Sequence, residues 1–194
     1  MPKSNLMEIR YHGRGGQGAK TVALLFGEAA LATGKYVQAF PEYGPERMGA
    51  PVQSFNRLSD EPITLHCAVT SPDVVVVLDP TLMETVNVTE GLGENGSIIV
   101  NTNLSPGEMR KELGLENGKV FTVDASKIAQ ETIGLNIPNT PMMGALVKVV
   151  GFLELDGVLE DTRKKLQKKF ARKPEVIDGN IESIKKAYHE VKGE

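Results

Sequence analysis

The fold is decided by the stretch Ile9-Arg-Tyr-His-Gly-Arg-Gly-Gly-Gln-Gly-Ala-Lys-Thr-Val-Ala-Leu-Leu-Phe26, in which a short strand-like run meets a glycine-rich turn and then an amphipathic helix. Gly13, Gly15 and Gly18 stand at the spacing G-x-G-x-x-G, which is typical of a strand-to-helix turn whose backbone N–H groups face a phosphate. Glycine suits such a turn because it permits positive φ and carries no Cβ. The stretch predicts the first βα unit of an α/β fold, with an anion site at its turn.

The candidate contacts of this anion site are the residues of the turn and one cation of the helix that follows: Gly13, Arg14, Gly15, Gly16, Gln17, Gly18 and Lys20. The positive end of the helix dipole favours an anion at the same place. A P-loop is excluded, because it needs Lys directly after its last glycine and Ala19 stands there. The glycine spacing also occurs in tight turns that bind nothing, so a purely structural turn remains open.

A dinucleotide-binding fold also requires an acid at the end of the second strand, about 20 residues after the glycines. Glu42 is roughly placed for this role, although it lies in the proline-rich segment Pro41-Glu-Tyr-Gly-Pro45. We therefore keep a free-standing dinucleotide-binding oxidoreductase as the alternative function.

Size and charge describe one ordinary globular domain over residues 1–194. The longest dense apolar run is Val74-Val-Val-Val-Leu78, far shorter than a membrane span, so we expect a cytoplasmic protein that does not bind a membrane. The net charge is −3, but residues 160–194 hold ten Lys or Arg and seven Asp or Glu, which leaves −6 for the rest. This asymmetry favours a protein partner over nucleic acid.

Cysteine and histidine limit the chemistry. Cys67 is the single cysteine, whereas an iron–sulfur cluster needs about four thiolates. The three histidines, at positions 12, 66 and 189, have no metal-ligand spacing. We predict no catalytic residue and no metal ligand in this chain, and we expect Cys67 to be a small buried apolar group.

Strand and helix patterns alternate along the chain and predict a doubly wound, Rossmann-like, mostly parallel sheet with helices on both faces and a helical C-terminal segment. The expected strands cover residues 6–12, 36–40, 52–58, 74–78, 97–100 and 119–123, with a further arm at 63–66. The expected helices cover residues 17–33, 81–91, 125–133, 139–152 and 175–191, with others starting at 105 and covering 163–173. Asp79 follows a buried strand and is expected to cap the next helix, a ribose or cation contact being the alternative.

Two further segments have unusual composition. The irregular stretch 41–51 holds Tyr43, Glu46 and Arg47, and we expect a binding surface there because such loops often carry function. In the helix predicted over 139–152, Thr140 is the expected cap and Pro141 the first helical residue. Gly144 in that helix indicates close packing of backbone on backbone, and Met143 is expected beside it at a core or an interface. The basic run Arg163–Lys173 has no assigned role.

Three stretches together resemble one family, the gamma subunits of 2-oxoacid:ferredoxin oxidoreductases, with the pyruvate enzymes the most similar. They are Gly13-Arg-Gly-Gly-Gln-Gly-Ala-Lys20, Tyr43-Gly-Pro-Glu-Arg-Met-Gly-Ala50 and Asn139-Thr-Pro-Met-Met-Gly-Ala-Leu-Val147. The likeness extends across nearly the whole chain, with the stretches in the family's order and spacing.

The resemblance implies an enzyme that decarboxylates a 2-oxoacid on thiamine diphosphate with Mg²⁺, passes electrons through [4Fe–4S] clusters to ferredoxin and gives the acyl group to coenzyme A. These cofactors are implied on other chains, the alpha, beta and delta-type subunits. The gamma chain would shape the assembly and help to close the coenzyme A site. The turn from Gly13 to Gly18, with Lys20, would touch a phosphate of coenzyme A or another subunit. Tyr43, Glu46, Arg47, Met143 and Gly144 would lie at subunit interfaces.

Overall fold

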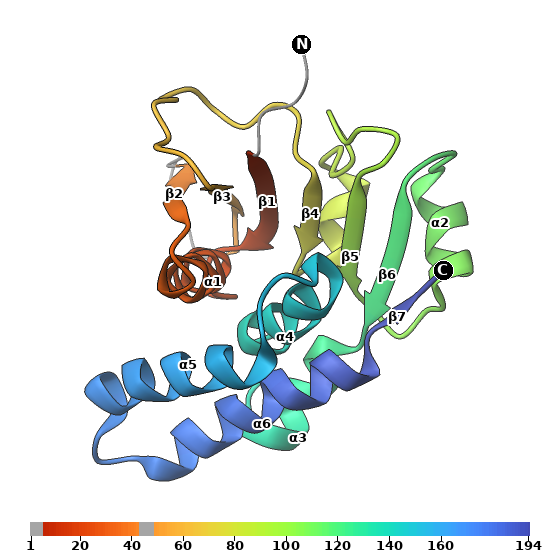
Figure 1. The fold of residues 1–194 in the computed structure, drawn as a ribbon. Coiled ribbons are helices and arrows are strands. Elements are labelled where there is room, and N and C mark those ends of the chain that lie inside the picture. The colour runs from red at the N-terminus through yellow and green to blue at the C-terminus, as the bar shows by residue number, and fades with distance from the viewer. Residues whose placement is uncertain (1–5, 43–48) are drawn as a thin grey trace.

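The protein, studied as a computed structural model that describes residues 6–42 and 49–194, is built on a seven-stranded sheet in the order β2-β3-β1-β4-β5-β6-β7 (Figure 1). Strands β1, β4, β5 and β6 are mutually parallel, while β3 is antiparallel to both β1 and β2 and β7 is antiparallel to β6. The strands are β1 Met7–Arg14, β2 Tyr36–Glu42, β3 Pro51–Ser59, β4 Val74–Val77, β5 Ser97–Asn101, β6 Lys119–Val123 and β7 Lys192–Gly193. This confirms the predicted α/β class and its parallel centre.

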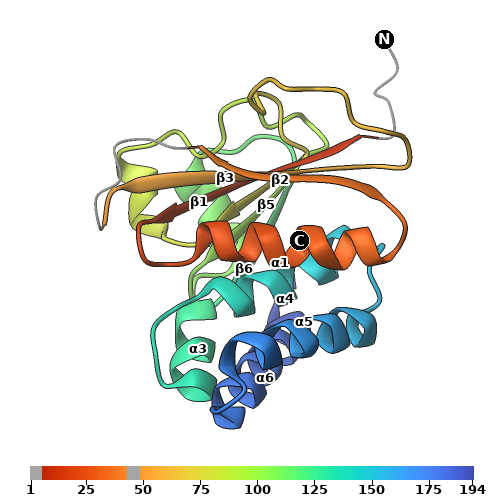
Figure 2. The ribbon, with the colours of Figure 1, turned by 90° about the vertical axis from the view of Figure 1, so that its left-hand side faces the viewer.

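Helices cover both faces of the sheet, unequally. One face carries a thick helical layer that lies below the sheet in Figure 2: α1 Ala19–Ala32, α3 Ala125–Ile133, α4 Asn139–Val150, α5 Leu155–Phe170 and α6 Pro174–Glu190. The other face carries the short 3₁₀ helix η1 Pro80–Glu84 and α2 Pro106–Leu113. The hydrophobic core is divided in the same way, with a large cluster under α1 and α4 and a small one under η1 and α2.

The closest packing in the helical layer is that of α4 on α6. A Cβ placed on Gly144 would lie 2.2 Å from the carbonyl oxygen of Ile184, so only glycine lets the two backbones approach this closely. Met143 beside it has no exposed surface. The predicted backbone packing at Gly144 is therefore within the chain. This corrects the expectation that Met143 and Gly144 contact another subunit, because both residues are buried within the chain itself.

Several local expectations hold and others do not. Ser105 and Glu108 form the predicted capping box, and Asp79 caps η1 by accepting a hydrogen bond from the backbone N–H of Thr81. The helix expected over 81–91 is only the short η1, and the arm expected over 63–66 is not a strand. Thr140 lies inside α4, where its hydroxyl donates to Asn180, so it is not the cap.

The connections place a topological switch between β1 and β4. After β1 the chain crosses the thick helical face through α1 towards β2, whereas after β4 it crosses the opposite face through η1 towards β5. The carboxyl ends of these two adjacent parallel strands therefore mark the switch point, which is where ligands of open α/β sheets bind. Both the glycine-rich turn and Asp79 lie at this edge.

Candidate functional site

The turn between β1 and α1 is shaped by two glycines in the left-handed region. Gly16 has φ 98° and Gly18 has φ 83°, and Gly18 stands at the N-cap of α1 without any side-chain cap. A Cβ on Gly18 would lie 2.7 Å from the side-chain nitrogen of Asn139, at the start of α4. Gly18 is therefore required both by its own backbone angle and by the close approach of α4.

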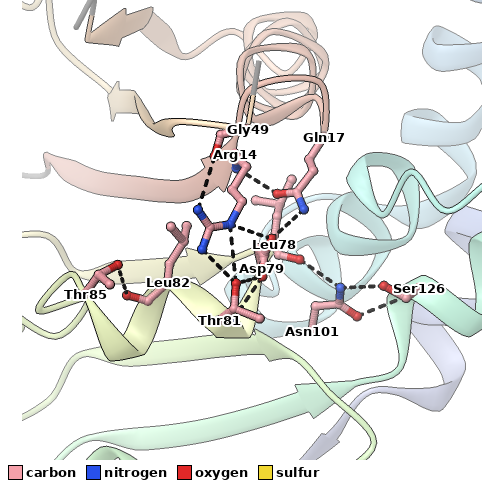
Figure 3. Close-up of polar contacts among 10 residues, drawn as sticks. All are labelled: Arg14, Gln17, Gly49, Leu78, Asp79, Thr81, Leu82, Thr85, Asn101 and Ser126. Atoms are coloured by element: carbon pink, nitrogen blue, oxygen red, sulfur yellow. Dashed lines mark hydrogen bonds and ion pairs between the residues drawn. The ribbon is translucent and has the colours of Figure 1, made fainter. Parts of the chain in front are cut away.

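Residues 49 and 50, which lead into β3, are hydrogen-bonded to this turn. The N–H of Gly15 donates to the carbonyl of Ala50 at 2.9 Å, and the N–H of Gly49 donates to the carbonyl of Gly15 at 3.3 Å. The guanidinium of Arg14 adds a third link at 3.1 Å to the carbonyl of Gly49 (Figure 3). The backbone N–H and carbonyl of Gly15, in the turn, are thus both hydrogen-bonded within the chain.

Arg14 and Gln17 meet Asp79 at the switch point (Figure 3). The Arg14 Nε lies 3.2 Å from a carboxylate oxygen of Asp79, which also accepts from the Gln17 amide at 2.7 Å. The other carboxylate oxygen accepts from the backbone N–H and the hydroxyl of Thr81, at 3.0 and 2.7 Å. The Gln17 side-chain oxygen in turn accepts the N–H of Arg14 at 2.7 Å. The end of β1 is therefore bonded to the end of β4.

These bonds keep Asp79 ionised. Burial by itself raises the pKa of this carboxyl, but the hydrogen bonds from Thr81 and Gln17 and the charge of Arg14 outweigh it and leave the pKa below its usual value. The side chains of Arg14 and Asp79 are 30% and 13% exposed. The switch point therefore holds a cation that is already neutralised by an anion of the same chain.

Asn101 continues this network to the next strands. Its amide donates to the carbonyl of Leu78 at 2.8 Å and to the hydroxyl of Ser126 at 2.9 Å, while its oxygen accepts the N–H of Ser126 at 3.0 Å (Figure 3). Leu78 follows β4, Asn101 ends β5 and Ser126 lies in the first turn of α3, so these bonds join the carboxyl ends of β4 and β5 to the start of α3.

Two buried arginines that were not predicted from the sequence lie on the face of the sheet opposite α1. Arg10 and Arg57 are 5% and 1% exposed, on β1 and β3. The Arg10 guanidinium donates to the carbonyls of Val88 and Glu90. The Arg57 guanidinium pairs with Glu8 at 2.8 Å and donates to the carbonyl of Cys67 at 2.8 Å. These two arginines hold the long connections before β4 and β5 against the sheet.

His12 completes this buried polar row. Its Nε2 accepts a hydrogen bond of 3.0 Å from the Nε of Arg10, and the ring borders a pocket of about 240 Å³ together with Glu42, Gln53 and four apolar residues. Burial, and beyond it the charge of Arg10, lowers the pKa of His12 from 6.5 to about 4. The alternation of Glu8, Arg10, His12 and Arg14 along β1 was the only sequence signal for this row.

The predicted site residues divide into three groups. Residues 13–18 lie together at the switch point, and Lys20 lies exposed on the first turn of α1. Tyr43, Glu46 and Arg47, predicted at an interface, lie outside the described residues. Met143 and Gly144 are buried in the chain's own core. Cys67, expected to be buried, is exposed in the loop before β4, where its carbonyl, and its thiol at 3.7 Å, accept from the Arg57 guanidinium.

The dinucleotide alternative is not supported. It needs an acid on a strand next to β1, but β3 lies between β1 and the strand that carries Glu42. In addition, the side chain of Asn139 fills the space beside Gly18. Within residues 6–42 and 49–194, no three His, Cys, Asp or Glu side chains gather in a way that could hold a metal ion, and no helix is long and apolar enough to cross a bilayer.

Comparison with known proteins gives consistent results. The family description "Pyruvate ferredoxin/flavodoxin oxidoreductase" matches residues 8–190. The chain is 51% identical over 185 residues to pyruvate synthase subunit PorC of Thermotoga maritima, which covers 95% of this chain and 94% of the relative. It is 52% identical over 153 residues to the common gamma subunit of the pyruvate/ketoisovalerate oxidoreductases of Pyrococcus abyssi, which covers 79% and 83%. The crystal structure of the Thermotoga subunit superimposes with a TM-score of 0.84 at 48% identity, covering 98% of this chain and 99% of that one.

Proposed function

The chain belongs to the pyruvate ferredoxin/flavodoxin oxidoreductase family, and we propose that it is the gamma subunit of a pyruvate:ferredoxin oxidoreductase. The observation that carries the proposal is the likeness to a pyruvate synthase subunit along almost the entire chain. The enzyme would cleave pyruvate oxidatively to acetyl-coenzyme A and carbon dioxide and pass the electrons to ferredoxin. Alpha, beta and delta-type subunits would complete it.

We place the redox cofactors on those other subunits. A [4Fe–4S] cluster takes about four thiolates, and the single thiol of Cys67 does not fit one. Mg²⁺ in such sites is held by one or two carboxylates together with phosphate oxygens of the cofactor, and we assign these carboxylates, with the thiamine diphosphate, to another subunit. When bound, those cofactors supply the decarboxylation and the electron transfer. The residues of this chain supply shape and contacts.

We further propose that the glycine-rich turn acts as a subunit contact that helps to close the coenzyme A site, and not as the direct phosphate ligand. A phosphate next to Arg14 would also approach the ionised Asp79, and like charges at short range repel. The turn's bonds to Gly49 and Ala50 instead fix the surface that the chain presents at this edge. This supports a role for Arg14 in holding the turn in place and not in binding phosphate.

Affinity purification of the tagged chain from its source cells tests the main proposal. We expect it to elute with iron-containing chains and with pyruvate- and coenzyme A-dependent reduction of ferredoxin. A monomer without partners, or one that oxidises pyruvate alone, would refute the proposal.

The role of the turn is tested in the assembled enzyme with Arg14→Ala, and with Lys35→Ala as the matched control. Lys35 forms an exposed ion pair with Asp60 near the start of β2, at the opposite end of α1 from the turn. We expect Arg14→Ala to loosen this chain from the complex while the KM for coenzyme A stays unchanged. A raised KM in a complex that remains intact would assign the phosphate to Arg14 instead.

A further inference from the structure

The basic residues of α5 and of the turn that follows it form two sets with different surroundings. The set in the middle of the helix is neutralised within the chain by ion pairs of 2.6 to 2.7 Å: Arg163 with Asp178, Lys164 with Glu160 and Lys165 with Glu28. These residues are explained by the stability and solubility of the helix.

The second set, which we call the basic tip, consists of Lys168, Lys169, Arg172 and Lys173. All four are exposed, and among residues 6–42 and 49–194 none of them has an acidic partner within ion-pair distance. They surround a shallow hollow of about 340 Å³ lined only by residues 168–173. The tip is the far end of the α5–α6 hairpin, which projects away from the sheet (Figures 1 and 2).

Helix electrostatics accounts for only half of the basic tip. Lys168 and Lys169 lie in the last turn of α5, where a cation complements the negative end of the helix dipole. Arg172 and Lys173 lie where α6 begins, and Lys173 is its N-cap, where the positive end of the dipole disfavours a cation. Glu175 in the first turn of α6 supplies one compensating charge. The tip therefore holds an excess of positive potential that an acidic group from outside would relieve.

We propose that the basic tip is a docking surface for a soluble acidic protein that binds reversibly, namely the electron carrier that the assembled enzyme reduces. This inference rests on the proposed function. The chain as a whole carries a net charge of −3, so an extended polyanion such as nucleic acid or an anionic bilayer would be repelled by most of its surface. A compact acidic protein can meet the projecting tip alone.

The chemistry of the tip fits a transient contact. Lysine is depleted from the cores of stable interfaces, which are more apolar. Exposed charges mainly accelerate encounter and select the partner, and salt screens their effect. Such a surface suits a carrier that must arrive, receive electrons and leave in each turnover.

The test uses the assembled oxidoreductase with the variant Lys168→Gln, Lys169→Gln, Arg172→Gln and Lys173→Gln. A charge-matched control removes four exposed lysines elsewhere on the chain, as Lys111→Gln, Lys119→Gln, Lys127→Gln and Lys192→Gln. The acceptors are an acidic ferredoxin and, as a small acceptor that needs no protein docking, methyl viologen. Activity with each acceptor is measured from low to high salt.

We expect the tip variant to lose on the order of tenfold in kcat/KM for ferredoxin at low ionic strength, with the loss vanishing at high salt and viologen activity unchanged. The control should keep its ferredoxin kinetics. Equal ferredoxin kinetics in the tip variant and the wild type would overturn the proposal. So would dissociation of the chain from the variant complex, because the tip would then contact a subunit. Failure of the proposed function would instead appear in the wild type, as a chain that never joins an active complex.

Discussion

The contact between α4 and α6 predicts that Gly144→Ala destabilises the protein, although alanine has a higher helix propensity than glycine. In Gly144→Ala the new Cβ would lie 2.2 Å from the carbonyl oxygen of Ile184, about 1.2 Å closer than an ordinary contact of 3.4 Å. The nearest neighbours of that Cβ are all backbone atoms of Ile184, so relief requires the two helices to separate. Overpacking of this kind costs about 3 kcal/mol at the upper end of its usual range, whereas Ala gains about 1 kcal/mol over Gly in a helix. We expect a net loss of about 2 kcal/mol.

For a chain of this length, such a loss lowers Tm by about 4–8 °C, measured by circular dichroism of the purified chain. The matched control is Gly157→Ala, in α5, where a new Cβ has no neighbour within 4 Å. This control should gain about 0.4–1 kcal/mol. If both variants are stabilised alike, the close approach of α4 and α6 does not exist and Gly144 has no packing role.

Three further predictions concern buried charge and capping. Arg57→Met should cost about 3–5 kcal/mol in urea unfolding because it leaves Glu8 and two carbonyls unpaired, whereas Lys35→Met, at an exposed pair, should cost under about 1 kcal/mol. The pKa of His12 is about 4 in the folded chain, against an ordinary value of 6.5 when unfolded, so the unfolded chain binds the proton first as pH falls from 6.5 towards 4. Stability should therefore drop by about 2 kcal/mol more between pH 7.5 and 5 in the wild type than in His12→Gln, and parallel pH curves would contradict this. Ser105→Ala should cost about 1 kcal/mol in thermal unfolding by removing the capping box, and no loss would contradict a role for the cap.

Features set by neighbouring residues could be read from the sequence. Strand β6 and helix α3 have the predicted bounds, 119–123 and 125–133, because hydrophobic periodicity and turn residues specify both. The Ser105 capping box and the Asp79 cap were also predictable, because each needs only a side chain and a backbone N–H two or three residues away. These are properties of short segments.

Features that depend on residues far apart in the sequence could not be predicted from it. The helix expected over 81–91 stops at Glu84, and the carbonyls of Val88 and Glu90 instead accept hydrogen bonds from Arg10 on β1. Likewise, no local pattern places β3 between β1 and the strand that carries Glu42, because that order depends on pairing along the whole of β1. Tertiary contacts override the local preference in both places.

The spacing of glycines in the turn predicts its backbone conformation correctly, but it does not identify the group that the turn contacts. Its spacing indicates positive φ and close approach, and Gly18 has both, but the group that approaches is Asn139 of α4. Arg14, the strongest hint of an anion, is bound to Asp79 from the end of β4, and a hydrogen bond to a charged group contributes about 1.5–3 kcal/mol. An incoming phosphate would have to replace that energy while facing the carboxylate it displaced. The charges at the switch point thus balance within the chain, which is why we propose a subunit contact for the turn and not a phosphate site.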